Sequence, residues 1–230
     1  IFGDNRRNLI GDDNVNLRLD TRELQHLDQT HHLHPFTDFH EYSQSGGRII
    51  TGAEHIYIFD SDGNRIQDAM SGLWCCSLGY SQDSIKLAMT EQLSQLPFYN
   101  NFFKCSNQPA VELASRLAQI TPVQFNHVFF TTSGSEANDT QIKLVHRYFD
   151  LLGQPTKRLI ISRNNAYHGS TIAASSLSGM SAMHKQTAGL DYVYHISQPH
   201  WYELGNARSP EEFGVWAANE LATMIDELGE

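Results

Sequence analysis

The chain has 230 residues, of which 40% are hydrophobic, 10% aromatic and 18% charged. This composition is typical of a globular protein that is long enough to bury a core, and it argues against disordered and fibrous classes. The formal net charge is -10 and no basic stripe runs along the chain, so nucleic acid and anionic membranes are not expected as partners.

The three cysteines, Cys75, Cys76 and Cys105, show no regular spacing. That pattern argues against a disulfide framework and favours reduced thiols in the cytoplasm. No apolar run approaches the roughly 20 residues of a membrane-spanning helix. Because the first residue is Ile1 and not Met, and Glu230 comes at the close of a helical pattern, we expect this chain to be a fragment of a longer protein.

The N-terminal third begins with a polar arm over residues 1–35, in which we expect a short helix near residues 20–27. A strand region follows Gly46 and Gly47. Alternating apolar residues at 56–59, a polar turn at 60–64 and a return strand from Ile66 predict a β-hairpin.

Helical periodicity dominates the rest of the chain and alternates with short apolar strands. The predicted helices cover residues 81–96, 108–120, a stretch around 142–152, a segment from 170, and 210–228 after a capping box at Ser209; the predicted strands cover 127–131, 158–162 and 192–196. This alternation predicts an α/β fold with a mainly parallel sheet flanked by helices. We assign residues 1–70 to the arm and a small β element, and residues 71–230 to part of a larger domain.

The most informative motif is the decapeptide FFTTSGSEAN at residues 129–138. It predicts a buried strand that ends in the turn Ser133-Gly134-Ser135 and opens a helix. A helix N-terminus carries unpaired N–H groups and the positive end of the dipole, Gly134 allows close approach of a ligand, and the serines add hydroxyls. Together they predict a phosphate site that needs no lysine. The alternative is that Ser135 only caps the helix.

A second motif, Asn165-Ala-Tyr-His-Gly169, directly follows a predicted strand. The carboxyl ends of such strands are where α/β folds bind ligands. Tyr167 is suited to stack on a planar ring, and Gly169 permits close packing. On its own the motif is weak, because a Tyr-His pair in a loop is more often structural.

Two turn-rich segments, residues 70–75 and 96–103, gather aromatic side chains. An apolar substrate pocket would use such residues. For any single aromatic, packing in the core or at a domain interface is the commoner explanation.

Four histidines in the arm, His31, His32, His34 and His40, suggest a metal site. We expect none, because no cysteine or carboxylate completes a compact ligand set in the sequence pattern. A nucleotide P-loop is also absent, since no Gly-Lys-Ser/Thr follows the turn.

The motifs as a set resemble one family. Ser133-Gly-Ser-Glu-Ala-Asn138, followed about thirty residues later by Tyr167-His168-Gly169, resembles the class III aminotransferases, which depend on pyridoxal 5'-phosphate (PLP). His34-Pro-Phe-Thr37, Ser71-Gly-Leu-Trp74 and the segment 97–103 are similar to the branch that acts on ω-amino acids and pyruvate. The likeness runs from about residue 20 to the end of the chain.

This resemblance implies the aspartate-aminotransferase-like PLP transferase fold and a homodimer whose active site is shared between subunits. It implies that the cofactor is bound by Gly134 and Ser135 at its phosphate, by Tyr167 stacked on its pyridine ring with His168 behind, and by the adjoining Ser133 and Gly169. It further implies that Trp74 and Tyr167 line the substrate pocket, and that Phe36, Phe102 and Phe103 approach a pocket, that of the partner subunit. Glu136 and Asn138 are taken as support for the helix start.

The implied activity is transfer of an amino group from an amine or ω-amino acid to a keto acid such as pyruvate. PLP enzymes need a Schiff-base lysine, which in this family lies beyond the matched region. None of the five lysines, Lys86, Lys104, Lys143, Lys157 and Lys185, has the family's context. We therefore expect no catalytic residue in this chain and no activity from it alone. The alternatives are a PLP-dependent aminomutase or decarboxylase on the same scaffold, or a non-catalytic relic without the lysine.

Overall fold

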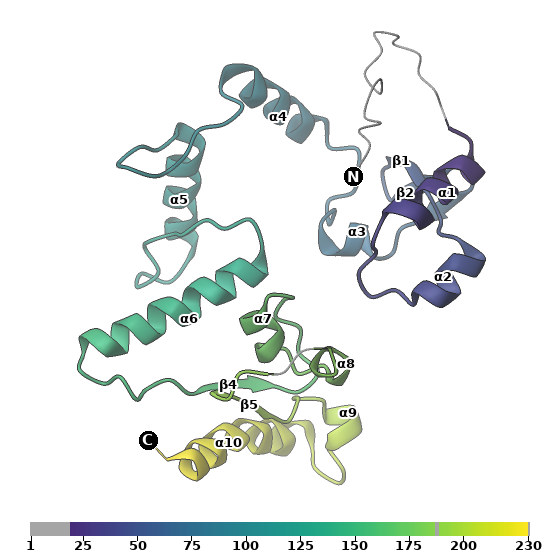
Figure 1. Cartoon of the computed structure of the whole chain (residues 1–230). Coiled ribbons are helices and arrows are strands. Elements are labelled where there is room, and N and C mark those ends of the chain that lie inside the picture. Colours follow the sequence, from purple (N-terminus) through teal and green to yellow (C-terminus); the bar gives the residue numbers. More distant parts are fainter. Residues whose placement is uncertain (1–18, 187–188, 230) are drawn as a thin grey trace, which may run out of the picture. The chain divides into compact units, whose positions relative to one another are not determined.

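The computed structural model describes residues 19–186 and 189–229. These residues divide after Asn107 into two units, which we describe separately (Figure 1). The predicted boundary after residue 70 concerns the domains of the whole protein and stays a prediction.

Among the described helices, none is both long enough and apolar enough to cross a membrane.

The first unit contains short helices around a small sheet. Its elements are α1 (Thr21–His31), α2 (Phe39–Ser45), β1 (Ile50–Glu54), β2 (Tyr57–Asp60), β3 (Arg65–Gln67), α3 (Ser71–Trp74) and α4 (Asp83–Gln95). The expected arm helix is present as α1, which begins at a capping box between Asp20 and Glu23. Helix α2 was not predicted; Asp38 caps it by accepting the backbone N–H groups of His40 and Glu41.

The predicted hairpin is confirmed. Strands β2 and β3 pair antiparallel with Ile58 opposite Ile66, and β1 adds a third strand on the other side of β2. The turn is fixed by Asp60, whose carboxylate accepts the backbone N–H groups of Asp62 and Asn64 at 3.1 and 2.8 Å. The Asn64 side-chain amide also bonds this carboxylate and lowers the pKa of Asp60 below its usual value.

The second unit contains the parallel part of the fold. Its elements are α5 (Gln108–Ile120), α6 (Gly134–Leu151), β4 (Ile160–Arg163), α7 (Ile172–Leu177), α8 (Ser181–His184), β5 (Val193–Ile196), α9 (Trp201–Leu204) and α10 (Pro210–Leu228). Strands β4 and β5 pair in parallel with Ile160 beside Val193, as the alternating pattern predicted. The capping box of α10 is also confirmed.

The strand predicted over residues 127–131 is wrong for the described chain, because no described segment pairs with it. Phe129, expected to be buried there, is 72% exposed. A short apolar segment takes up strand structure only when a neighbour accepts its backbone hydrogen bonds. Within residues 19–186 and 189–229, the parallel sheet accordingly consists of β4 and β5.

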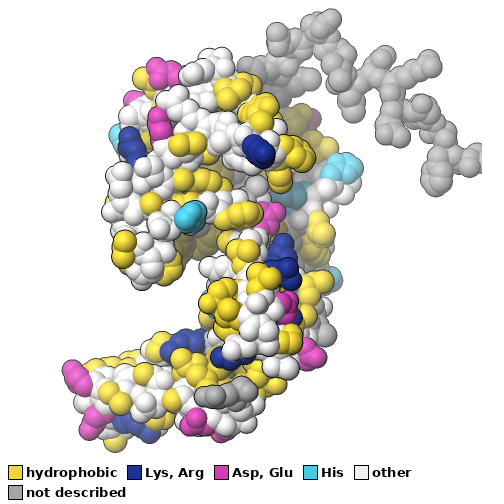
Figure 2. Space-filling view, turned by 90° about the vertical axis from the view of Figure 1, so that its left-hand side faces the viewer, with side chains coloured by type: hydrophobic (Ala, Val, Ile, Leu, Met, Phe, Trp, Pro, Cys, Tyr) yellow, Lys and Arg dark blue, Asp and Glu magenta, His cyan; other side chains and the backbone are white. Residues whose placement is uncertain are grey.

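The described core lies in the second unit, between the helices and β5. Its buried hydrophobic residues are Ile142, Ala174, Leu177, Met183, Ile196, Phe213 and Ala217. No hydrophobic residue in the described part of the first unit is buried. Many large apolar side chains stand at the surface among polar ones (Figure 2). The best-packed part of the chain is therefore the part that carries the phosphate-site motifs.

Candidate functional site

Helix α6 opens at the predicted Ser-Gly-Ser turn, and Ser133 is its N-cap. The Ser133 hydroxyl oxygen accepts the N–H of Glu136 at 3.2 Å. The Glu136 carboxylate accepts two hydrogen bonds from Thr132, one from its backbone N–H at 2.9 Å and one from its hydroxyl. These bonds lower the pKa of Glu136. The expected role of Glu136 at the helix start is confirmed. The cap is Ser133 and not Ser135, so the alternative that Ser135 merely caps the helix is wrong.

The start of α6 offers donors and space for an anion. Within the described residues, the backbone N–H groups of Gly134 and Ser135 have no hydrogen-bond acceptor. A Cβ atom placed on Gly134 would meet nothing within 4 Å. Two N–H groups at the positive end of an 18-residue helix, next to open space, fit a phosphate group.

The loop of the second motif follows β4, and backbone hydrogen bonds connect it to Gly179. The N–H of Asn165 donates to the Gly179 carbonyl at 3.0 Å, and the N–H of Gly179 donates to the Ala166 carbonyl at 2.9 Å. Tyr167 is exposed whereas Gly169 is buried. The backbone of the loop is thereby fixed while the Tyr167 ring remains accessible for stacking.

The structure brings the two motifs together in one site. The N–H of Ser170 donates to the Ser135 hydroxyl oxygen at 3.1 Å, and the Asn138 side-chain amide donates to the His168 carbonyl at 2.7 Å. Thr171 adds a third link through its hydroxyl, which donates to Asp139 at 2.7 Å. The Ser133–Ser135 turn and the Tyr-His-Gly loop are therefore positioned by the same helix.

His168 is fixed by its backbone on both sides. Its N–H donates to the Ser178 hydroxyl oxygen at 2.8 Å, and its carbonyl accepts the Asn138 amide. Sequence reasoning missed these roles of Asn138 and Ser178 and the pair Asp139–Thr171. A signal for Asn138 existed, because a residue four positions after Gly134 lies on the same helix face.

Asn138→Ala is expected to lower the free energy of unfolding of the complete protein by about 1–3 kcal/mol. The substitution leaves the part-buried His168 carbonyl without its 2.7 Å donor. Urea denaturation measures the effect, with Gln141→Ala, an exposed position on the same helix, as the matched control. Equal losses for the two variants would show that the link does not hold the loop.

Of the five aromatic residues predicted to line a pocket, Tyr167 belongs to the second unit and the other four belong to the first, so the position of these four relative to the Ser133–Ser135 turn stays a prediction. All four are exposed: Phe36 by 73%, Trp74 by 86%, Phe102 by 70% and Phe103 by 94%. Phe102 and Phe103 lie with ring centroids 6.1 Å apart. Core packing within the described chain, the commoner explanation in general, is therefore wrong for these residues.

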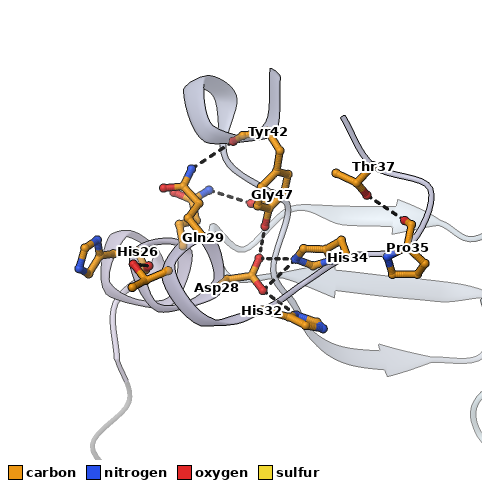
Figure 3. Close-up of polar contacts among 11 residues, drawn as sticks. His26, Asp28, Gln29, His32, His34, Pro35, Thr37, Tyr42 and Gly47 are labelled. Carbon is orange, nitrogen blue, oxygen red and sulfur yellow. Dashed lines mark hydrogen bonds and ion pairs between the residues drawn. The ribbon is translucent and has the colours of Figure 1, made fainter. Parts of the chain in front are cut away.

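One premise of the argument against a metal site in the arm is wrong, because the carboxylate of Asp28 does lie beside two of these histidines. Asp28 lies beside His32 and His34, and one potential ligand atom from each lies within 4.8 Å of the others (Figure 3). The sequence pattern left out Asp28 because contact with His34 requires the chain to bend after α1. His31 and His40 are not members of this group.

The chain is similar to known aminotransferases. A family profile described as Aminotransferase class-III matches residues 41–225. The chain is 52% identical over 211 residues to the putrescine–pyruvate aminotransferase of Pseudomonas aeruginosa, over 91% of this chain and 46% of that protein. It is 41% identical over 196 residues to a probable mitochondrial gamma-aminobutyrate transaminase 2 of Oryza sativa, over 84% of this chain and 39% of that one.

Among solved structures, omega transaminases match this chain as well. The omega transaminase from Pseudomonas jessenii in complex with PMP matches with a TM-score of 0.86 and 38% identity, over 90% of this chain and 46% of that one. An (S)-enantioselective omega-transaminase from Thermomicrobium roseum matches with a TM-score of 0.87 and 32% identity, over 92% and 47%. The chain thus spans less than half the length of each of these proteins, and its fold matches theirs over the shared part.

Proposed function

On the premise that this chain belongs to the class-III aminotransferase family and has its PLP-transferase fold, we propose that the whole protein transfers an amino group from an amine or ω-amino acid to a keto acid such as pyruvate. The observation that carries the proposal is the joining of the Ser133–Ser135 turn to the Tyr167 loop by Asn138 and Ser135. The 52% identity to a putrescine–pyruvate aminotransferase supports putrescine and pyruvate as substrates.

The cofactor that fits this site is PLP. When bound, PLP supplies an electron sink that stabilises negative charge on the substrate carbon. The N–H groups of Gly134 and Ser135 would hold its phosphate at the helix start. The Ser135 oxygen already accepts the Ser170 N–H, so its hydroxyl proton is left to donate to the phosphate. Tyr167 would stack on the ring from a loop whose backbone is fixed at His168.

In this proposal the residues of this chain bind and orient PLP, and a lysine in the remainder of the protein transfers the proton. Two of the five lysines in this chain make other contacts. Lys86 pairs with Asp83 at 3.2 Å, and Lys157 lies over the Phe149 ring at 5.3 Å from its centroid. We propose a homodimer that completes the site across subunits, which the exposed aromatic residues support. The cytoplasm is the compartment we propose, supported by the free thiols of the three cysteines.

The decisive experiment incubates the complete protein with PLP, putrescine and pyruvate and measures alanine. Alanine that appears only when all three are present supports transamination. Carbon dioxide or a rearranged amino acid from an amino-acid substrate, without alanine, would indicate a decarboxylase or an aminomutase. No turnover of any donor, with PLP bound or not, would indicate a non-catalytic relic.

Trp74→Ala is expected to change kcat/KM for an aryl amine by roughly tenfold or more relative to putrescine, because an indole supplies a large apolar wall. A pocket residue should leave the melting temperature and the PLP affinity nearly constant, and the Trp74 side chain is 86% exposed within this chain. Tyr202→Ala, at a 91% exposed aromatic in the second unit, is the control and should leave the ratio unchanged. Equal losses for both amines with a lower melting temperature would make Trp74 a packing residue.

A further inference from the structure

One carboxylate and two imidazoles meet where α1 ends (Figure 3). Asp28 lies one helical turn before His32, and the chain then bends so that His34 reaches the same carboxylate. His32 Nδ1 lies 2.8 Å from Asp28 Oδ1, and His34 Nε2 lies 3.0 Å from Oδ1 and 3.1 Å from Oδ2. In Figure 3 both rings point at Asp28 from one side of α1.

From this arrangement we propose that Asp28, His32 and His34 bind a divalent transition-metal ion such as Zn²⁺. Imidazole nitrogen and carboxylate oxygen are ordinary zinc ligands, at about 2.0–2.2 Å from the metal. In a tetrahedral site such bonds place neighbouring ligand atoms about 3.3 Å apart. The oxygen–nitrogen distances of 2.8 and 3.0 Å are shorter than this, and the two ring nitrogens lie within 4.8 Å of each other, so the ligand atoms have to move outward from Asp28 to admit an ion.

The surroundings of the three ligands suit a metal site with an open position. Tyr42, from α2, donates its hydroxyl to Asp28 Oδ2, which orients the carboxylate as outer hydrogen bonds do around metals. The Asp28 and His34 side chains are 15% and 25% exposed, whereas His32 at 63% leaves a path for the ion and a fourth ligand water.

The proposal concerns the first unit alone and does not depend on the proposed activity. A bound ion would connect the end of α1 to the segment that leads into α2, in addition to the bonds from Gln29 to Tyr42 and from Gln25 to Gly47. Without an ion, the same contacts are a hydrogen-bonded cluster around Asp28. A metal titration separates these two descriptions.

The test uses the complete protein, freed of metal with a chelator and titrated with Zn²⁺ in a calorimeter. One ion per chain is expected, and Co²⁺ in its place should give the visible absorption of tetrahedral coordination. His32→Ala should weaken binding roughly tenfold or more, as expected when a ligand is lost from a site whose outer partners alone contribute 10–100-fold. Asp28→Asn should weaken it further.

His31→Ala and His40→Ala are the matched controls. His31 is the last residue of α1 and is not in the group around Asp28, and His40 bonds Gln44 at 3.0 Å, so neither variant should change the affinity more than about twofold. Because the His32 side chain is 63% exposed, circular dichroism should show His32→Ala folded as the parent. Absence of Zn²⁺ binding, or equal weakening by His31→Ala and His32→Ala, would overturn the proposal.

Discussion

Gly169→Ala is expected to lower the free energy of unfolding of the complete protein by roughly 2–5 kcal/mol. Two effects add. The φ angle of Gly169 is +131°, a region that other residues enter only with strain. A Cβ atom there would clash with the Ser135 hydroxyl oxygen and would lie 2.8 Å from the Ala174 Cβ and 2.9 Å from the Ser135 Cα. Because one of these is a backbone atom, the loop has to move away from the Ser133–Ser135 turn.

Such a movement should also weaken PLP binding, since Ser170 and His168 would lose their bonds to Ser135 and Asn138. Urea denaturation and a PLP titration measure the two effects. Gly214→Ala is the control: a Cβ there meets nothing within 4 Å, and an alanine inside α10 should raise stability by roughly 0.5–1 kcal/mol. If both variants are equally stable, the loop does not pack on the turn as closely as described.

The parts of the fold that sequence predicted have local signals. The α10 capping box is contained within four residues, and the hairpin turn is fixed by Asp60 bonding to residues two and four positions later. The parts that failed depend on distant partners. Residues 127–131 have the apolar pattern of a strand, but strand structure also needs a neighbour. Helix α2 has only seven residues, too few for periodicity to show.

In the candidate site too, the features with local signals were predicted and those that depend on distant partners were missed. The Ser-Gly-Ser turn and the helix that it opens were predicted because glycine, serine and apolar spacing act locally. The bonds that join this turn to the Tyr-His-Gly loop span 30 and 35 residues, and only the fold brings those positions together. The Asp28 cluster was missed although its three residues are close in sequence. Asp28 and His32 are helical neighbours, but His34 joins them through a bend outside the helix.

Gly134→Val is expected to weaken PLP binding by the complete protein roughly a hundredfold or more, about 3 kcal/mol. The valine would place a branched side chain where two backbone N–H groups have to approach the phosphate. Charge-assisted bonds of this kind are worth roughly 1.5–3 kcal/mol each. Folding should be little affected, because a Cβ at Gly134 meets nothing within 4 Å and the position starts a helix. A PLP titration and the melting temperature of the cofactor-free protein measure the two quantities.

Two serine variants complete the test by separating cofactor binding from helix capping. Ser135→Ala removes the proposed bond to the phosphate together with the acceptor of the Ser170 N–H, and should weaken PLP binding by roughly tenfold to a hundredfold, less than Gly134→Val. Ser133→Ala removes the cap of α6, whose oxygen accepts the Glu136 N–H at 3.2 Å, and should lower the free energy of unfolding by about 1 kcal/mol. If Gly134→Val and Ser135→Ala lowered only the melting temperature while PLP bound as before, the start of α6 would be a structural turn and the phosphate site would lie elsewhere.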